Sequence, residues 1–234
     1  MKPSIALSER TTVHRASERG HHDRETVHAI VDAAWLCHVA FTDRDAETGE
    51  PYPVSLPTAC WRMGDQVFIH GSNGSRMMKR LASGAPVCLS VTLLDGMVLA
   101  RSAFSHSMNY RSVVVFGQFE VVPEADKPAV LDAFMDHIAP GRRLEARPGD
   151  VHELKATTVL ALSLAEASAK IRAWGPHDKE GDESLPVWAG VLPLREQRLA
   201  PVPDARTAEQ GRPLPEYLSA WLQAQPAAPA MNKD

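Results

Sequence analysis

The strongest chemical signal in the chain is a predicted strand, turn and helix over Val67–Leu81. The turn contains Gly71 and Gly74, which let a backbone approach a ligand closely. Ser75 and Arg76 fall at the start of the predicted helix, where unpaired N–H groups favour an anion. A guanidinium at this point can hold a phosphate through two hydrogen bonds. These residue types in this order predict a phosphate site with Arg76 as its main charge.

Two further residues of this segment extend the hypothesis, and a plain structural interpretation stays open beside it. Ser72 offers a second hydroxyl, and Lys79 adds positive charge one helical turn further on. In the structural interpretation, Ser75 is an ordinary N-cap and the cations face solvent. The segment has neither the Gly-Lys-Ser/Thr of a P-loop nor the G-x-G-x-x-G of dinucleotide folds. Its G-x-x-G lacks the helix context of a KH domain.

A second polar cluster opens the longest predicted strand: Asn109, Tyr110, Arg111 and Ser112. It places an amide, a phenol, a guanidinium and a hydroxyl within four residues. Such a cluster suits a binding site, but the same side chains can also pack on the outside of a barrel.

Among the ten histidines, His70 and His106 are best placed to touch a cofactor, although a histidine at a strand end is often structural. No H-x-x-x-H or H-E-x-x-H spacing occurs, so we expect no metal site. A hydrolase is not supported either, because no G-x-S-x-G elbow surrounds a serine.

Hydrophobic periodicity predicts the elements that must position these residues. A helix capped by Asp23 carries an apolar stripe from Val27 to Trp35, and the period then changes to that of a strand. The expected strands cover residues 36–43, 51–63, 66–70, 87–94, 110–122 and 158–164, and the further helices cover residues 76–83 and 124–138. Residues 96–109 are expected to be irregular, with short helical potential.

Six strands with mostly short connections predict a mainly β fold with flanking helices, a closed or split antiparallel barrel. Residues 1–22 are polar and are expected to form a flexible N-terminal arm. Residues 23–174 form the barrel domain. Residues 175–234 are rich in proline and are expected to wrap a surface, with a helical patch at residues 215–223 and disorder in residues 225–234.

Composition narrows the function classes. The net charge of −4 disfavours a general nucleic-acid binder. The three cysteines form no C-x-x-C pair, so they are expected to be buried thiols in a reducing compartment. The N-terminus lacks the apolar region of a signal peptide, and no segment is apolar over a length that spans a bilayer. We therefore expect a cytoplasmic protein with no membrane partner.

Four stretches carry a resemblance to a known family: residues 23–27, Val67–Leu81, residues 86–96 and residues 100–114. The chain resembles the FMN-binding split-barrel superfamily of pyridoxamine 5′-phosphate oxidase, in particular its flavin-nucleotide-binding branch with the nitroimidazole-resistance proteins. The similarity covers roughly residues 23–195. The second and fourth stretches are the specific ones.

The resemblance implies a homodimer that binds FMN at the subunit interface. A Ser-Arg pair holds the FMN phosphate in the oxidases, and the matching pair here is Ser75-Arg76. By position, the strand that lies along the isoalloxazine ring is Val54, Ser55, Leu56 and Pro57. The block Asn109–Ser112 is implied to face the flavin or the dimer seam. Trp188 could cover a flavin face from the neighbouring subunit, or anchor the tail on the barrel or the dimer partner.

The chain departs from true pyridoxal-forming oxidases. Their Arg-Leu-His-Asp-Arg segment near the C-terminus is missing, and Ser55 and Leu56 stand where a basic residue lies on the strand that enters the phosphate site. Pyridoxamine phosphate is therefore not the expected substrate.

Two functions follow from the resemblance. The first is an FMN-dependent oxidoreductase acting on a small molecule, with the flavin as the carrier of hydride or electrons. The second is a flavin- or haem-binding protein without turnover, for storage or sensing, with haem contacting His70 or His106. The sequence leaves open whether FAD or a deazaflavin replaces FMN.

Overall fold

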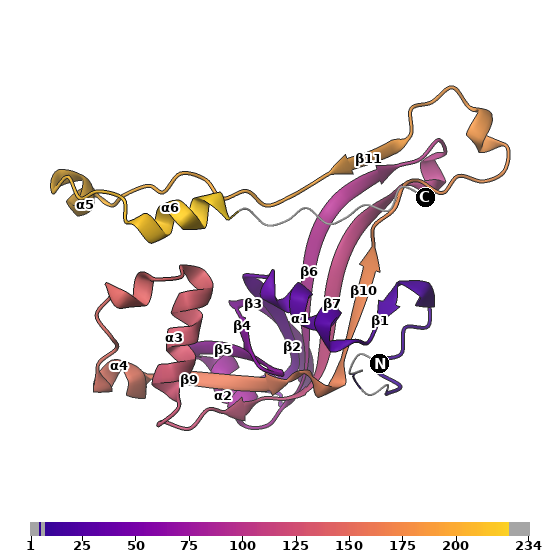
Figure 1. Ribbon diagram of the computed structural model, residues 1–234. Helices are drawn as coiled ribbons and strands as arrows, with labels where there is room; N and C mark the ends of the chain where they lie inside the picture. The colour runs from indigo at the N-terminus through magenta and orange to yellow at the C-terminus, as the bar shows by residue number, and fades with distance from the viewer. Residues whose placement is uncertain (1–4, 6–7, 225–234) are drawn as a thin grey trace.

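The chain folds into two antiparallel β-sheets with helices packed around them (Figure 1). The computed structural model describes Ile5 and residues 8–224. The larger sheet has the order β1 (Gly20–His21), β10 (Ala167–Arg172), β7 (Ser107–Gln118), β6 (Pro86–Leu99), β2 (Leu36–Arg44), β3 (Pro51–Ala59), and β11 (Gly190–Pro193) pairs with β6. The smaller sheet has the order β4 (Trp61–Met63), β5 (Gln66–Ser72), β9 (Thr157–Ser163), β8 (Glu120–Val121).

Six α-helices accompany the sheets in the described residues: α1 (Arg24–Asp32), α2 (Arg76–Ala82), α3 (Lys127–Ile138), α4 (Val151–Ala156), α5 (Ala205–Glu209) and α6 (Glu216–Gln223). Asp23 caps α1 as expected, with its side chain accepting from the backbone N–H of Thr26 at 2.9 Å. The mainly β fold with flanking helices is confirmed. The expectation of disorder for residues 225–234 lies outside the described residues.

The described residues contain eleven strands rather than six. Two expected strands are each divided in two, residues 51–63 into β3 and β4 and residues 110–122 into β7 and β8. The other three strands, β1, β10 and β11, have two to six residues and were not predicted, because such short runs carry little periodicity. β6 is also longer than predicted, since residues 96–109 were expected to be irregular but the strand continues to Leu99, with an irregularity between Leu94 and Gly96. A Cβ on Gly96 would lie 3.0 Å from the carbonyl oxygen of Leu192, so β11 needs a glycine there to approach β6.

Two apolar clusters stabilise the fold, one on each face of the smaller sheet. Val67 and Ile69 of β5 point into the main cluster, which also includes Val27 and Ile30 of α1 and Leu89 of β6. Alternate residues of the same sheet, Trp61, Phe68, Val159 and Ala161, form a second cluster together with Val122 and with Val130 of α3. The period-two alternation of these strands therefore places successive apolar side chains in two separate cores, one on each face of the sheet.

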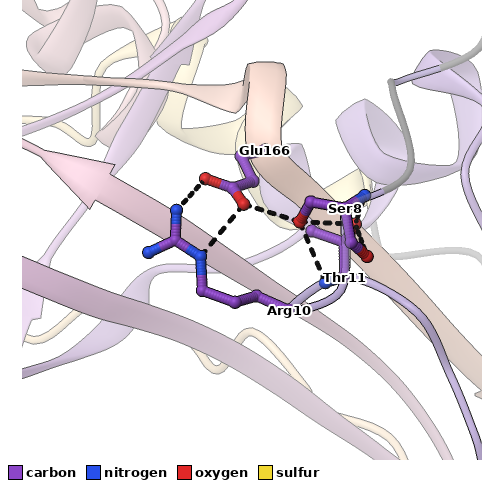
Figure 2. Close-up of polar contacts among 4 residues, drawn as sticks. All are labelled: Ser8, Arg10, Thr11 and Glu166. Atoms are coloured by element: carbon purple, nitrogen blue, oxygen red, sulfur yellow. Dashed lines mark hydrogen bonds and ion pairs between the residues drawn. The ribbon is translucent and has the colours of Figure 1, made fainter.

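The N-terminal segment is held to the turn between β9 and β10 by one carboxylate (Figure 2). Glu166 accepts from the Ser8 hydroxyl at 2.6 Å and from Arg10 Nε at 3.1 Å, with a second ion pair to Arg10 Nη2. The hydrogen bond from Ser8 and the charge of Arg10 lower the pKa of Glu166. Thr11 is fully buried beside these residues. A cluster of polar residues thus fixes this segment on the sheet.

Two parts of the chain extend beyond the sheets (Figure 1). The ends of β6 and β7 form a long hairpin, residues 94–110, which we term the arm; its tip includes a short 3-10 helix at Ala103–Ser105. β11 returns antiparallel to β6 along this arm, and the chain then runs back to α5 and α6. No helix in the described part of the chain is long and apolar enough to cross a membrane.

Candidate cofactor-binding site

The turn between β5 and α2 is fixed by its own polar atoms. The carbonyl of Ser72 accepts from the N–H of Ser75 at 2.9 Å, and the Ser72 hydroxyl accepts from the N–H of Gly74 at 3.2 Å. Asn73 anchors the turn from outside, since its amide donates to the carbonyl of Lys155 and accepts from the Thr158 hydroxyl at 2.7 Å. The turn is therefore preorganised by α4 and β9. Ser72 serves this turn in the described structure.

The two glycines of the turn have different roles. A Cβ on Gly71 would lie 2.9 Å from Cγ of Met78, so this glycine lets α2 pack against β5. Gly74 has only the Ser72 hydroxyl nearby, at 3.6 Å. The close approach that the sequence suggested for a ligand is, at Gly71, an approach to a side chain of the same molecule.

Arg76 is held by the ends of two neighbouring strands. Its Nε lies 2.7 Å from the Asp43 carboxylate, and its Nη2 donates to the Tyr52 hydroxyl at 2.6 Å and to the Arg44 carbonyl at 2.9 Å. No described residue accepts from Nη1, and the side chain is 63% exposed. The guanidinium is thus fixed on one edge and presents two N–H groups to solvent, which is the arrangement that can receive a phosphate.

Asp43 and Tyr52 are candidate site residues that the sequence reasoning missed. They lie directly opposite each other in the β2–β3 ladder. The predicted hairpin turn at Thr48-Gly49 indicated that the two strands pair, but counting outward from it places Asp43 opposite Val54, two residues away from the observed register.

Three further residues at the start of α2 or on it were part of the predicted site or carry charge next to it in the sequence. The Ser75 hydroxyl caps α2 by accepting from the N–H of Met78 at 3.4 Å, and its own proton stays available to a ligand. Lys79 is exposed on α2. Arg80 Nε donates to the Thr42 carbonyl at 3.1 Å and so ties α2 to β2.

The predicted ring-binding residues lie on β3, which begins at the Arg76 site. β3 is the edge strand of the larger sheet and pairs only with β2. Val54 packs against the main core, whereas Ser55, Leu56 and Pro57 are exposed. The outer edge of β3 therefore offers backbone groups to a flat ligand, with the guanidinium of Arg76 at one end.

The block Asn109–Ser112 on β7 lies apart from Arg76. Asn109 is buried, and its side-chain oxygen accepts from Nη1 of Arg172, which is also buried. Burial, followed by the nearby charge of Arg19, lowers the pKa of Arg172. Ser112 donates to the Lys170 carbonyl at 3.3 Å. These contacts join β7 to β10.

Arg111 points into a cavity of about 670 Å³, beside the half-buried Tyr110. Its guanidinium binds the Asp95 carboxylate through two hydrogen bonds of 2.8 and 2.9 Å. The cavity is also lined by the end of α1, by His137 of α3 and by the tail residues Leu194, Arg195, Glu196 and Arg198. Its volume is in the range of small-molecule sites.

The remaining predicted site residues lie in two other places. The His70 ring packs against Trp61 and Phe134 in the second cluster, at centroid distances of 5.6 and 4.6 Å, and burial lowers its pKa. His106 lies at the arm tip, and Trp188, 63% exposed, lies beside β11. Figure 1 shows β11 and α2 at opposite ends of the molecule, so one chain does not bring Trp188 to Arg76. Within the described residues, no group of three or more His, Cys, Asp or Glu side chains is placed so that it could hold a metal ion.

Comparison with known proteins identifies relatives that match most of the chain. A family model described as pyridoxamine 5′-phosphate oxidase matches residues 23–171. The structure of the flavocytochrome Anf3 from Azotobacter vinelandii is 42% identical, with a TM-score of 0.82, over 91% of this chain and 96% of that one. The FAD and haem binding protein from Mycobacterium smegmatis is 40% identical, with a TM-score of 0.80, over 86% and 96%. A search of curated proteins finds no match.

Proposed function

This chain belongs to the pyridoxamine 5′-phosphate oxidase family, and we propose on that basis that it binds a flavin nucleotide and haem and transfers electrons to or from a small molecule. The observation that carries the flavin assignment is Arg76, fixed by Asp43 and Tyr52 with Nη1 free at the end of an open edge strand. Two relatives that are at least 40% identical support both cofactors, since one is a flavocytochrome and the other is described as binding FAD and haem.

In this proposal Arg76 and the Ser75 hydroxyl bind a phosphate of the nucleotide. The exposed edge of β3 at Ser55–Pro57 holds the flat ring through backbone groups. FAD is favoured over the FMN expected from the sequence, because the M. smegmatis relative is described with FAD. The flavin supplies hydride or single-electron transfer when bound, so the protein needs no nucleophile of its own.

The proposal includes a homodimer in which the tail contacts the partner. Exposed apolar side chains lie along the tail, with Leu199 and Val202 exposed by 71% and 90%. A partner subunit would bury them and could bring its Trp188 to the flavin. A reducing, cytoplasmic location fits the three free cysteines. A flavin-saturated protein that sediments as a monomer would contradict the dimer.

The assignment is tested with the variant Arg76→Ala. Loss of a charged hydrogen bond to a phosphate costs about 2 kcal/mol, so we expect flavin affinity to fall roughly 30-fold. Arg143→Ala is the matched control, because Arg143 is also an exposed arginine bound through Nε to an aspartate, Asp136, at 2.9 Å. The measurement is flavin titration, with the nucleotide released from the native protein identified by chromatography as FAD or FMN.

Three outcomes are informative. A wild-type protein with no flavin bands near roughly 370 and 450 nm would overturn the flavin assignment. Equal affinity in Arg76→Ala and wild type would place the phosphate elsewhere. Bound flavin that no nicotinamide nucleotide reduces would favour storage or sensing over electron transfer.

A further inference from the structure

The hydrogen bond of His106 leaves one ring nitrogen open at the arm tip. Nδ1 lies 3.0 Å from the carbonyl oxygen of Ser102. A carbonyl only accepts, so Nδ1 carries the proton and Nε2 keeps its lone pair. No described residue bonds Nε2, and the side chain is exposed. Metal-binding histidines commonly show this arrangement, with Nδ1–H on a backbone carbonyl and Nε2 facing the metal.

Other histidines with defined contacts are less suited to bind a metal through Nε2. Nε2 of His137 lies 3.2 Å from the Ala34 carbonyl, and Nε2 of His28 lies 3.0 Å from the Asp65 carboxylate. The ring of His70 is enclosed by Trp61 and Phe134. His106 therefore stands out among the histidines whose contacts are described.

The arm beside His106 carries an apolar surface with a cation at its edge. Met108 lies opposite Met97 in the β6–β7 ladder, and Met97 lies opposite Leu192 of β11, so the three side chains form one row. Their exposed fractions are 48%, 40% and 47%. Phe104 is 86% exposed, and the Lys179 ammonium lies 5.1 Å from its ring centroid. No carboxylate of the described chain forms an ion pair with Lys179.

We propose that His106 is the haem ligand of this chain. This inference rests on the haem part of the proposed function and names its residue. Haem is an apolar macrocycle with two carboxylates, and the arm offers groups of matching chemistry: the exposed apolar row, the Lys179 ammonium over Phe104 and the Nε2 lone pair of His106. Nε2 of His106 would bind the iron, and Lys179 would pair with a propionate. The Ser102 carbonyl positions the ring and raises its basicity.

The test is haemin binding by the full-length protein. Because even the partners of metal ligands contribute 10- to 100-fold to affinity, we expect His106→Ala to weaken haemin binding at least about tenfold and to shift or abolish the Soret band. Flavin content should stay unchanged. His106→Gly should regain the band when imidazole is added, which a purely structural histidine would not show. The control is His152→Ala, at an exposed histidine on α4.

The outcomes separate this inference from the proposal on which it rests. If the wild-type protein takes up no haemin, the haem part of the proposed function fails and His106 has no ligand role. If wild-type protein binds haemin and His106→Ala gives the same Soret band and affinity, the ligand is another residue. Loss of binding without rescue by imidazole would also count against direct ligation.

Discussion

At the scale of single residues, the contacts that a side chain makes within the protein decide which of its polar atoms are available to a ligand. Arg76 and Arg111 are both partly exposed arginines paired with a buried aspartate. Nε and Nη2 of Arg111 both donate to the Asp95 carboxylate, so the two side chains form an ion pair with no net charge inside the cavity. Arg76 spreads its contacts over Asp43, Tyr52 and a backbone carbonyl, and its Nη1 has no acceptor among the described residues.

His70 gives a prediction at this scale. Burial lowers its pKa below the ordinary 6.5, so the unfolded chain binds a proton that the folded protein resists. Stability should therefore be unaffected at pH above about 6.5 and should fall as pH decreases below it. His70→Phe keeps an aromatic ring against Trp61 and Phe134 but cannot titrate.

The measurement is urea unfolding of both proteins between about pH 7 and pH 5. We expect the loss of stability on acidification to be smaller in His70→Phe than in wild type. The exposed His152→Ala variant should follow wild type. An identical pH slope in His70→Phe and wild type would mean that His70 titrates normally in the fold.

At the scale of elements, the β5–α2 turn positions the candidate phosphate site by packing. Met78 is buried on α2 and covers Gly71 of β5. Asn73 ties the turn to the end of α4, whose start is fixed by a capping box between Asp150 and Glu153. A hydrogen bond from Arg147 to Glu153 lowers the pKa of that carboxyl to about 2. The orientation of Ser75 and Arg76 therefore depends on three elements: β5, α2 and α4.

Gly71→Ala tests this dependence. The added methyl group would overlap Cγ of Met78, so we expect a loss of about 1–3 kcal/mol in the free energy of unfolding and weaker flavin binding as α2 moves. Gly74→Ala is the control in the same turn, where only the Ser72 hydroxyl is near.

A double-mutant cycle identifies the cause. Met78→Ala alone leaves a cavity, but combined with Gly71→Ala it removes the overlap, so the double variant should lose less stability than the two single losses added together. Simple addition of the two losses would show that the methyl group clashes with something other than Met78.

At the scale of the whole molecule, one arginine joins the tail to the barrel. The Arg198 guanidinium lies 5.6 Å from the Trp35 ring and 4.5 Å from the Trp221 ring. Its Nη1 donates to the carbonyls of Trp221 and Ala224, both at 2.7 Å. Trp35 and Arg198 also line the cavity, so α6 and the cavity wall are stabilised by the same side chain.

Removing this contact should release α6. Charged hydrogen bonds contribute about 1.5–3 kcal/mol each, so we expect Arg198→Ala to raise amide hydrogen exchange in α6 at least about tenfold, with the barrel strands unchanged. Arg206→Ala on α5 is the control. Unchanged exchange in α6 would show that other contacts hold the tail in place.

The sequence alone determined the large elements and the family. Strong alternation in residues 36–43 and 87–94 and the Asp23 cap required no distant partner, because local periodicity and capping are encoded within a few residues. The order Gly, Ser, Arg after a strand, together with three further stretches, was also sufficient to predict the family, whereas the phosphate role of Arg76 stays a prediction.

Only the tertiary structure decided which residues meet. Asp43 and Tyr52 reach Arg76 through the β2–β3 register, β11 joins β6 from almost 100 residues away, and Gly71 faces Met78 rather than a ligand. His70 and His106 looked equivalent in the sequence, but packing enclosed one and left Nε2 of the other open. The physical reason is that strand pairing and side-chain packing are long-range, and a single sequence records each partner without recording the pair.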